Sequence, residues 1–323
     1  MKNAKPSYDV SIVIVSYNTR ELLEDCLASL FTSLVDLRFE IWVVDNASSD
    51  GSADMVENRF PLVHCIRNSA NLGFARANNK AMRHVAGRYV VLLNSDTVMV
   101  PMALETIVSF MDKHQGIGIC GGQLLNQDGS LQNSIASMPS LATELLNKSL
   151  LRRVFPDKYL GKELNIDTPL EVESIIGACM VVSRAAIEDV GLLDERYFFF
   201  FEETDWCLSM RKAGWKVCFH PHAKIFHLQG GSAKKVPIPV RIEYWKSRYL
   251  FFHKHLSASR FLFLRTGLII RLLISLVTQS VAAPFSAGIR SRLNLNWSLL
   301  RWHLHGCPDS WGIANGTVGE GNR

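Results

Sequence analysis

The sequence predicts an α/β fold with a mostly parallel central sheet, followed by a C-terminal helical extension. Within the first 120 residues, short apolar runs alternate with segments in which apolar residues recur at helical spacing. The apolar runs are nearly continuous, as in strands that are buried on both faces of a sheet. Four of these runs end in Asn or Asp. In parallel sheets, ligands bind beyond the carboxyl ends of the strands.

The expected elements follow one another in a regular order. The expected strands span residues 10–17, 39–46, 62–68 and 88–96, and the expected helices span residues 19–31, 71–86 and 101–114. Pro101 suits the first turn of the third helix. Further along, "NQDG" at residues 126–129 predicts a hairpin turn, and residues 172–191 predict a strand and a helix with Ser183 as N-cap. Residues 137–170 are irregular, and we expect a mobile loop or a small insertion there.

The four strand ends carry polar side chains to one edge of the predicted sheet. They are Ser16, Tyr17 and Asn18, then Asp45 and Asn46, then Asn68 to Asn71, and finally Asn94, Ser95 and Asp96. A single polar strand end is ordinary turn chemistry. Four of them on one edge predict a polar crevice suited to a ligand that is rich in hydrogen-bonding groups.

Two common nucleotide motifs are missing from the sequence. No GxGxxG follows the first strand, and GxxxxGK[ST] does not occur, so neither a dinucleotide fold nor a P-loop is indicated. The phosphates of a bound nucleotide would therefore need another counter-charge. A divalent cation held by Asp96 would supply it, because hard cations favour oxygen ligands and bridge diphosphates.

Composition limits the classes of partner. The chain has 323 residues, 48% hydrophobic and 20% charged, with a net charge of +5 that lies mostly between Lys234 and Arg301. A basic, apolar C-terminal part favours anionic lipid or phosphate over nucleic acid. The seven cysteines are scattered without a CxxC pair, which argues for reduced thiols in the cytoplasm and against a zinc site. The N-terminus lacks the apolar stretch of a signal peptide.

Two further sets of residues are candidates for chemistry. Glu202, Glu203 and Asp205 directly follow four phenylalanines, Phe198 to Phe201. They either cap a helix that opens at Thr204 or Asp205, or provide a general base whose pKa is raised by an apolar wall. We favour the base. His227 ends an apolar strand before a Gly-Gly turn and is suited to bind a metal or a diphosphate.

Seven segments carry a resemblance to a known family. In order along residues 9–232, about 70% of the chain, they are "VSIVIVSYNTRELLEDCLASL", "IWVVDNASSDGS", "NLGFARANNKAM", "VVLLNSDTVM", "GACMVVSR", "GLLDERYFFFFEETDWCLSMRKAGW" and "HLQGGS". Together they resemble the family 2 glycosyltransferases of the GT-A fold, a Rossmann-like nucleotide-binding fold. The similarity is greatest to the bacterial rhamnosyltransferase-like branch.

The resemblance implies roles for the residues at the sheet edge. Asn94-Ser95-Asp96 stands where the family has its DxD motif, so Asp96 is the implied Mn²⁺ or Mg²⁺ ligand and Asn94 an implied sugar or ribose contact. His227 is the implied second metal or diphosphate contact. The implied nucleotide and donor pocket comprises Ser16, Tyr17, Asn18, Asp45, Asn71, Gly73, Phe74, Asn78, Asn94, Ser95 and Asp96.

The resemblance also implies a catalytic base and an acceptor pocket. Glu203 stands where the family has the Asp of a Glu-Asp pair, which leaves the choice between Glu202 and Glu203 open, with Glu203 favoured by alignment. The implied reaction is a direct displacement with inversion at the anomeric carbon. Gly177, Ala178 and Trp206 would shape the acceptor pocket, although Trp206 is equally explained as a core residue.

The C-terminal third predicts helices that are both basic and apolar. Residues 1–235 would form the catalytic domain, residues 236–305 the helical extension, and residues 306–323 a disordered tail. The longest uncharged run, residues 272–289, is marginal for a spanning helix, which needs about 20 apolar residues. We expect amphipathic helices at the inner face of the cell membrane, or contacts within the protein or a homodimer.

The expected function is transfer of rhamnose from dTDP-rhamnose to a lipid-linked or polysaccharide acceptor in cell-envelope glycan synthesis. Two alternatives belong to other classes. A sugar nucleotidyltransferase usually has a Gly-rich, basic first loop, whereas "SYNTRELL" contains no glycine. A non-catalytic, membrane-attached sugar-binding scaffold is compatible with Glu at position 203, but Asp96 and His227 argue against it.

Overall fold

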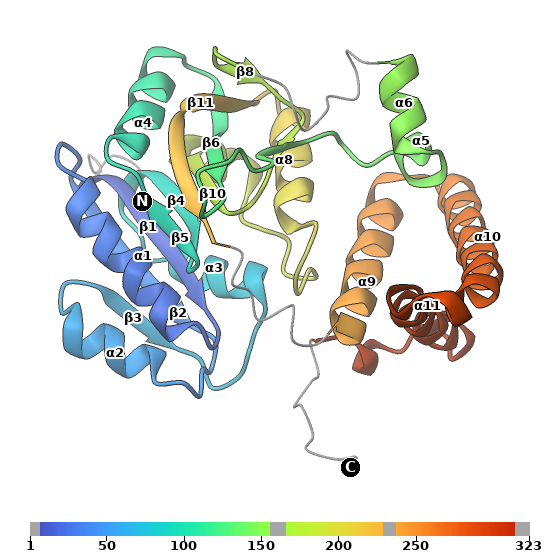
Figure 1. Ribbon diagram of the computed structural model, residues 1–323. Helices are drawn as coiled ribbons and strands as arrows, with labels where there is room; N and C mark the ends of the chain where they lie inside the picture. Colours follow the sequence, from blue (N-terminus) through green and yellow to red (C-terminus); the bar gives the residue numbers. More distant parts are fainter. Residues whose placement is uncertain (1–6, 156–165, 229–236, 314–323) are drawn as a thin grey trace. The chain divides into compact units, whose positions relative to one another are not determined.

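The structure, a computed structural model, describes residues 7–155, 166–228 and 237–313. The chain divides into two compact units, one α/β and one helical (Figure 1). The α/β unit comprises Met1–Met138, Asp157–Arg196 and Glu202–Ser232, and the helical unit comprises Pro139–Pro156, Tyr197–Phe201 and Ala233–Arg323. The predicted domain boundary after residue 235 lies outside the described residues.

A mixed sheet forms the centre of the α/β unit. Within the described residues it has nine strands: β1 (Tyr8–Ser16), β2 (Phe39–Asp45), β3 (His64–Arg67), β4 (Gly87–Asn94), β5 (Thr97–Met99), β6 (Ile117–Leu125), β8 (Leu170–Glu171), β10 (Cys179–Ser183) and β11 (Lys216–His227). The order is β3-β2-β1-β4-β10-β6-β11-β5, with β8 on β11. Strands β3, β2, β1 and β4 are parallel, as are β6 and β11. Strands β10, β5 and β8 run antiparallel to their neighbours. A separate ribbon pairs β7 (Ile135–Ala136) with β9 (Ser174–Ile175).

Helices cover both faces of this sheet. They are α1 (Arg20–Ser33), α2 (Ser52–Arg59), α3 (Phe74–Met82), α4 (Ala103–Lys113), α7 (Arg184–Val190) and α8 (Glu202–Lys212). Ile12 and Ile14 of β1 belong to the core under α1, α2 and α4, whereas Val13 belongs to the core under α3, α7 and α8. Each of these side chains is fully buried, which stabilises the fold by about 1.5–3 kcal/mol per residue. Burial on both faces explains why the strand is apolar throughout.

Several predicted elements begin or end elsewhere. The first four strands lie within two residues of the expected bounds, and the hairpin at "NQDG" is present, with Gly129 N–H bonded to the Asn126 carbonyl at 2.9 Å. Pro101 lies two residues before α4, the third of the expected helices, which begins at Ala103. Residues 137–170 contain α5 (Leu141–Leu145), α6 (Lys148–Val154) and β8. The helix expected to open at Thr204 or Asp205 begins at Glu202.

Three long helices dominate the helical unit. They are α9 (Pro237–His255), α10 (Ala258–Ala282) and α11 (Ala287–Leu304). The unit also contains α5, α6 and the 3₁₀ turns Ala283–Phe285, between α10 and α11, and Asp309–Trp311, after α11. The last of these turns lies within the predicted tail, so this part is folded, and residues 314–323 lie outside the described residues. Phe251, Phe252 and Trp302 are buried at the centre of the unit.

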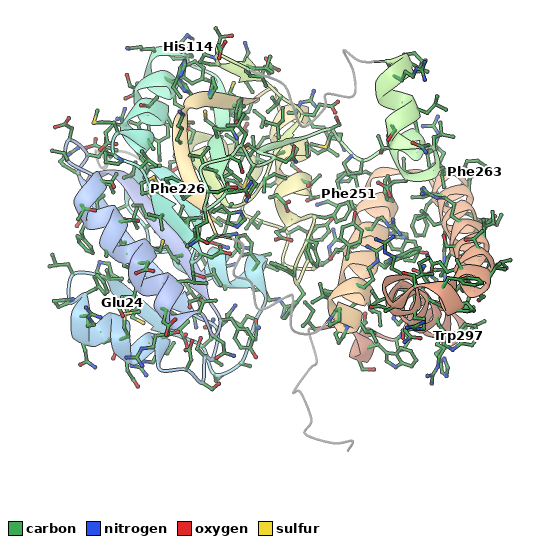
Figure 2. The ribbon with its side chains drawn as sticks, in the orientation of Figure 1. Glu24, His114, Phe226, Phe251, Phe263 and Trp297 are labelled. Atoms are coloured by element: carbon green, nitrogen blue, oxygen red, sulfur yellow. The ribbon has the colours of Figure 1, made fainter. Side chains whose placement is uncertain are left out.

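Helix α10 presents an apolar face to the outside of its unit. Phe263, Ile274, Val277 and Val281 are each more than half exposed, and Figure 2 shows Phe263 on the outer side of α10. The segment Ala258–Phe285 contains an 18-residue window with a mean hydropathy of 1.9, and it is long and apolar enough to cross a membrane by length and composition alone.

Candidate active site

The turn between β4 and β5 places Asp96 beside His227. Strand β4 ends at Asn94 and β5 begins at Thr97, so Asp96 lies in a tight turn. Strand β5 pairs antiparallel with the end of β11, and Thr97 lies opposite His227. As a result, Oδ1 of Asp96 and Nε2 of His227 are 3.4 Å apart, with each side chain 13% exposed. Two residues far apart in the sequence thus meet at a site that a small ligand can reach.

Gln132 fixes the orientation of the His227 ring. Its Oε1 lies 2.6 Å from Nδ1 of His227, while its Nε2 donates to the His227 carbonyl at 3.1 Å and to Oδ1 of Asn126 at 2.9 Å. Because the amide nitrogen of Gln132 faces two acceptors, its oxygen faces Nδ1, and Nδ1 carries the proton. In the neutral imidazole, Nε2 then directs a lone pair towards Asp96.

This arrangement suits a divalent cation. The separation of 3.4 Å is longer than the roughly 2.7–2.9 Å of a charge-assisted hydrogen bond. Two ligands about 2.1 Å from one ion and at right angles to each other would lie about 3 Å apart. No group of three His, Cys, Asp or Glu side chains that could hold a metal occurs among the described residues. An ion bound here would therefore complete its coordination with oxygens of a ligand.

Hydroxyl groups connect the end of β1 to the same turn. Ser16 Oγ lies 3.0 Å from Thr19 Oγ1, which lies 2.9 Å from Ser95 Oγ. Asn18 adopts a left-handed backbone with φ of 54° and accepts the Ser49 N–H at 2.8 Å. These bonds join the ends of β1, β2 and β4 into one polar edge, as the sheet geometry predicted. Tyr17, in the same loop, is 37% exposed.

Asparagine side chains hold the entry to α3. Asn46 Nδ2 donates to the Gly73 carbonyl at 3.2 Å, and Asn46 Oδ1 accepts from Asn68 Nδ2 at 2.8 Å. Asn71 Oδ1 accepts the Gly73 N–H at 3.0 Å. Gly73 has φ of 79° and ψ of 178°, a conformation that is essentially confined to glycine. This turn sets the start of α3 at Phe74.

Two buried acceptor atoms in the predicted nucleotide pocket have no partner among the described residues. Asp45 accepts the Ser48 N–H through Oδ2 at 3.0 Å, but its Oδ1 is buried and unpaired. Asn78 donates to the Phe74 carbonyl at 2.9 Å, but its Oδ1 is likewise unpaired. Buried polar atoms normally have a hydrogen-bond partner, so both atoms are suited to accept from a ligand or from water.

The loop before β10 joins Asn94 to the predicted base. Asn94 N–H donates to the Ala178 carbonyl at 2.9 Å. The neighbouring Gly177 packs on Glu203 so closely that a Cβ at position 177 would lie 3.3 Å from Cγ of Glu203. The absence of a side chain at Gly177 therefore leaves room for Glu203. The short loop of Gly177 and Ala178 thus contacts both Asn94, at the start of the turn of Asp96, and Glu203, in the first turn of α8.

Both glutamates at the start of α8 have a raised pKa. Burial raises the pKa of Glu202 well above its ordinary value, and the nearby Glu203 adds to this effect. Burial also raises the pKa of Glu203. Glu202 is 4% exposed, and its Oε2 has no hydrogen-bond partner among the described residues, whereas Glu203 is only partly buried. Glu203 is thus the more accessible of the two.

The segment before α8 is strained. Phe200 and Phe201 have φ of 74° and 69°, a left-handed conformation that bulky residues rarely adopt. The ring of Phe201 packs on Tyr244 and Phe251 of the helical unit, to which Phe201 itself belongs. The phenylalanine run predicted to form a wall around the acids is thus part of the helical unit.

Trp206 lies in the hydrophobic core. It is 2% exposed, belongs to the core under α3, α7 and α8, and donates its indole N–H to the Gly191 carbonyl at 3.0 Å. The core explanation given above therefore accounts for Trp206, and its burial does not support an acceptor contact.

Sequence reasoning missed Thr19, Ser48 and Gln132. Thr19 directly follows Asn18 and Ser48 lies two residues after Asn46, so the same strand-end rule could have found them. Gln132 lies in a hairpin loop and reaches His227 only through the pairing of β6 with β11, which the sequence pattern does not reveal.

Comparison with known proteins identifies the class. The family model "Glycosyl transferase family 2" matches residues 11–191, which is more than half of the chain. The chain therefore belongs to this family and is a glycosyltransferase. The matched residues include the turn of Asp96 and the loop of Gly177.

Two curated relatives extend beyond the matched region. The chain is 29% identical over 256 residues to the N-acetylglucosaminyl-diphospho-decaprenol L-rhamnosyltransferase of Mycobacterium tuberculosis, covering 74% of this chain and 82% of the relative. It is 27% identical over 253 residues to the dTDP-rhamnosyl transferase RfbF of Shigella flexneri, covering 75% and 79% of the two chains.

Two solved structures share the fold. The mannosyltransferase PcManGT from Pyrobaculum calidifontis, in complex with GDP-Man and Mn²⁺, has a TM-score of 0.56 at 15% identity and covers 94% of this chain and 89% of its own. GalNAc-T7 with UDP, GalNAc and Mn²⁺ has a TM-score of 0.55 at 16% identity, covering 76% and 50%. These likenesses confirm the predicted GT-A fold.

Proposed function

We propose that this glycosyltransferase moves rhamnose, with inversion, from dTDP-rhamnose to a lipid-linked or polysaccharide acceptor in cell-envelope glycan synthesis. The observation that carries the proposal is the pair of Asp96 and His227, 3.4 Å apart at the edge of the sheet where nucleotides bind in such folds. The names of two relatives support the sugar, and one of them also supports a lipid diphosphate acceptor.

The proposed cofactor is Mn²⁺ or Mg²⁺, held by Asp96 and His227. Carboxylate oxygen suits Mg²⁺ and Mn²⁺, while imidazole suits softer ions, so the mixed pair favours Mn²⁺. When bound, the ion would neutralise charge that develops on the leaving diphosphate. The Mn²⁺ complexes of the two structural neighbours support the same choice.

The nucleotide would bind along the polar edge of the sheet. Asp45 Oδ1, buried and unpaired among the described residues, would accept from an N–H of the base. The proposed contacts to base, ribose and donor sugar are Ser16, Tyr17, Asn18, Asp45, Asn71, Gly73, Phe74, Asn78, Asn94 and Ser95. A thymine or uracil ring offers the N–H that Asp45 would need.

Glu203 would act as the general base. A carboxylate with a raised pKa holds a proton more readily, as a base near neutral pH requires. It would take the proton of the acceptor hydroxyl as that oxygen attacks the anomeric carbon from the face opposite to the diphosphate. Gly177 and Ala178 would line the path of the acceptor beside it.

The helical unit would bring the enzyme to its acceptor. The exposed apolar face of α10 and the surrounding arginines suit the surface of an anionic membrane. We therefore propose a cytoplasmic enzyme held at the inner face of the cell membrane. Alternatively, a second copy of the chain would cover the apolar face of α10 in a homodimer, and this face would then not need membrane lipid to shield it from water.

Titration calorimetry with dTDP, UDP and GDP tests the donor. We expect dTDP to bind more tightly than GDP, and only with Mn²⁺ or Mg²⁺ present. Preferred binding of GDP would contradict the dTDP assignment. Release of a nucleoside diphosphate and transfer of rhamnose to a prenyl-diphosphate-linked N-acetylglucosamine would then separate a transferase from a nucleotidyltransferase or a scaffold.

Gln132→Leu should weaken cation binding without unfolding the protein. The change removes the acceptor of the His227 Nδ1–H, and loss of such an orienting partner typically lowers metal affinity by about 10–100-fold. Mn²⁺ titration followed by electron paramagnetic resonance in the presence of dTDP measures the effect. Gln132→Glu keeps an acceptor and should restore most of the affinity. Equal Mn²⁺ affinities for Gln132→Leu and the wild type would contradict this role.

A further inference from the structure

The helical unit contains a cavity whose lining is rich in arginine. Residues of α5, α9, α10 and α11 line most of an open cavity of about 1020 Å³, and every lining residue belongs to this unit. Ligand pockets typically measure about 300–1,000 Å³, so this one can hold a ligand larger than a phosphate ion. Its charged lining residues are Arg241, Arg248, Arg271, Arg292 and one carboxylate, Glu144.

Arg248 is buried at the cavity with part of its hydrogen-bonding capacity unused. It is 8% exposed, and its Nη1 donates to Oε2 of Glu144 at 3.1 Å. Its guanidinium lies 3.9 Å from the ring centroid of Trp245. Its Nε and Nη2 are buried and find no acceptor among the described residues. Buried N–H donors without a partner are costly, so a ligand that supplies acceptor oxygens would be strongly favoured here.

The other three arginines are exposed. Arg271 donates to the Glu144 carbonyl, and Arg241 lies 5.8 Å from the ring centroid of Tyr244. Since Glu144 already pairs with Arg248, the lining carries a clear excess of positive charge. Guanidinium groups match phosphate oxygens with two parallel hydrogen bonds, and a diphosphate can engage more than one guanidinium.

Apolar side chains line the same cavity. Val240 of α9, Leu268 and Leu272 of α10 and Leu295 of α11 contribute hydrocarbon surface. An inorganic phosphate would accept hydrogen bonds from the arginines but would leave this apolar surface in contact with water. A ligand that joins a diphosphate to a hydrocarbon chain would satisfy both parts of the lining.

We propose that this cavity binds the diphosphate and the adjoining hydrocarbon of a prenyl diphosphate lipid. The inference rests on the proposed function, in which the acceptor is lipid-linked, and assigns its anionic anchor to the helical unit. Arg248 and Arg292 bind the diphosphate oxygens, and Leu268 and Leu272 contact the first prenyl units.

Calorimetry with farnesyl diphosphate, inorganic diphosphate and farnesol tests the assignment. The titrations are made in EDTA, so that a metal-dependent donor site does not take up diphosphate. We expect saturable binding of farnesyl diphosphate, at least tenfold weaker binding of inorganic diphosphate, and none of farnesol. Equal affinity for the two diphosphates would overturn the lipid part of the proposal. Absence of binding by either would overturn it entirely.

Matched variants locate the site. Arg292→Gln should raise the dissociation constant of farnesyl diphosphate about tenfold or more, as expected for loss of a charge-assisted hydrogen bond. Arg301→Gln, on the same helix, exposed and outside the cavity lining, should leave it unchanged. Equal weakening by both would indicate non-specific charge attraction and overturn the site.

A second titration with dTDP and Mn²⁺ separates the two proposals. We expect the arginine variants to keep wild-type nucleotide binding, which also shows that they are folded. If dTDP binds with Mn²⁺ and farnesyl diphosphate does not bind, the cavity proposal fails and the proposed function stands. If the wild type binds farnesyl diphosphate and no nucleotide, the donor assignment fails and the cavity keeps its ligand but loses its role in acceptor binding.

Discussion

Asp96→Asn should abolish the Mn²⁺-dependent binding of the nucleotide and lower the rate of sugar transfer about 10³-fold or more. The amide keeps the size of the side chain but removes the negative charge that, with Nε2 of His227, would hold the ion. A metal ion typically contributes several kcal/mol to the stabilisation of a departing phosphate, and each 1.36 kcal/mol corresponds to about tenfold in rate. Calorimetry with dTDP and Mn²⁺, together with single-turnover transfer rates, measures both effects.

A surface aspartate provides the control for Asp96. Asp25 lies on α1 and is exposed, so Asp25→Asn removes the same charge without touching the turn. We expect Asp25→Asn to bind and turn over like the wild type. His227→Ala should resemble Asp96→Asn, and the double variant should be little worse than either, because both residues serve one ion. Additive losses would argue against a shared cation.

The polar edge was predictable because it follows from the sheet alone. Apolar strands alternating with helices imply parallel pairing, and parallel pairing brings Ser16, Asp45 and Asn94 to one edge. Nothing in that pattern indicates that β11 returns beside the three-residue strand β5. The meeting of Asp96 with His227 was therefore expected only through the family resemblance, and the contact of Gln132 was not expected.

The segment from residue 137 to 170 shows the limit of periodicity. Helices α5 and α6 have five and seven residues, too few for a helical pattern to emerge. Ser140 and Thr143 form a capping box at the start of α5, and Asn147 accepts two backbone N–H groups at the start of α6. Such caps compensate for the unfavourable nucleation of short helices, and they were visible in the sequence as Ser and Asn.

The contacts of the phenylalanine run before α8 were only partly predictable. Composition correctly predicted apolar surroundings for Glu202, which is buried with a raised pKa. It could not show that Phe201 packs on Tyr244 and Phe251, because those contacts join segments more than 40 residues apart.

Glu203→Gln should reduce the turnover of sugar transfer by about 10²–10⁴-fold while leaving dTDP binding intact, since a general base contributes an effect of this size. Glu202→Gln should reduce turnover much less, because Glu202 is buried and Glu203 is the more accessible carboxylate. Transfer rates at saturating donor and acceptor measure the difference. A larger loss for Glu202→Gln would reassign the base. Gly177→Ala gives an independent check, because its added Cβ would meet Cγ of Glu203 at 3.3 Å and displace that side chain.

The pH dependence separates the two carboxylates further. A general base acts when ionised, so wild-type turnover should rise with pH through a pKa above the ordinary 4.5 of Glu, as burial requires. The contribution of a raised carboxyl pKa to the free energy of unfolding changes with pH in the opposite direction to turnover. A carboxyl group whose folded-state pKa is raised stabilises the protein below the unfolded pKa, and this contribution is lost as pH rises through the folded pKa. Because burial raises the pKa of Glu202, Glu202→Gln should gain unfolding free energy relative to the wild type as pH rises from 4 to 8. Denaturant unfolding at several pH values measures this gain, and a wild-type advantage that grows with pH would show that Glu202 is ionised and paired in the folded protein.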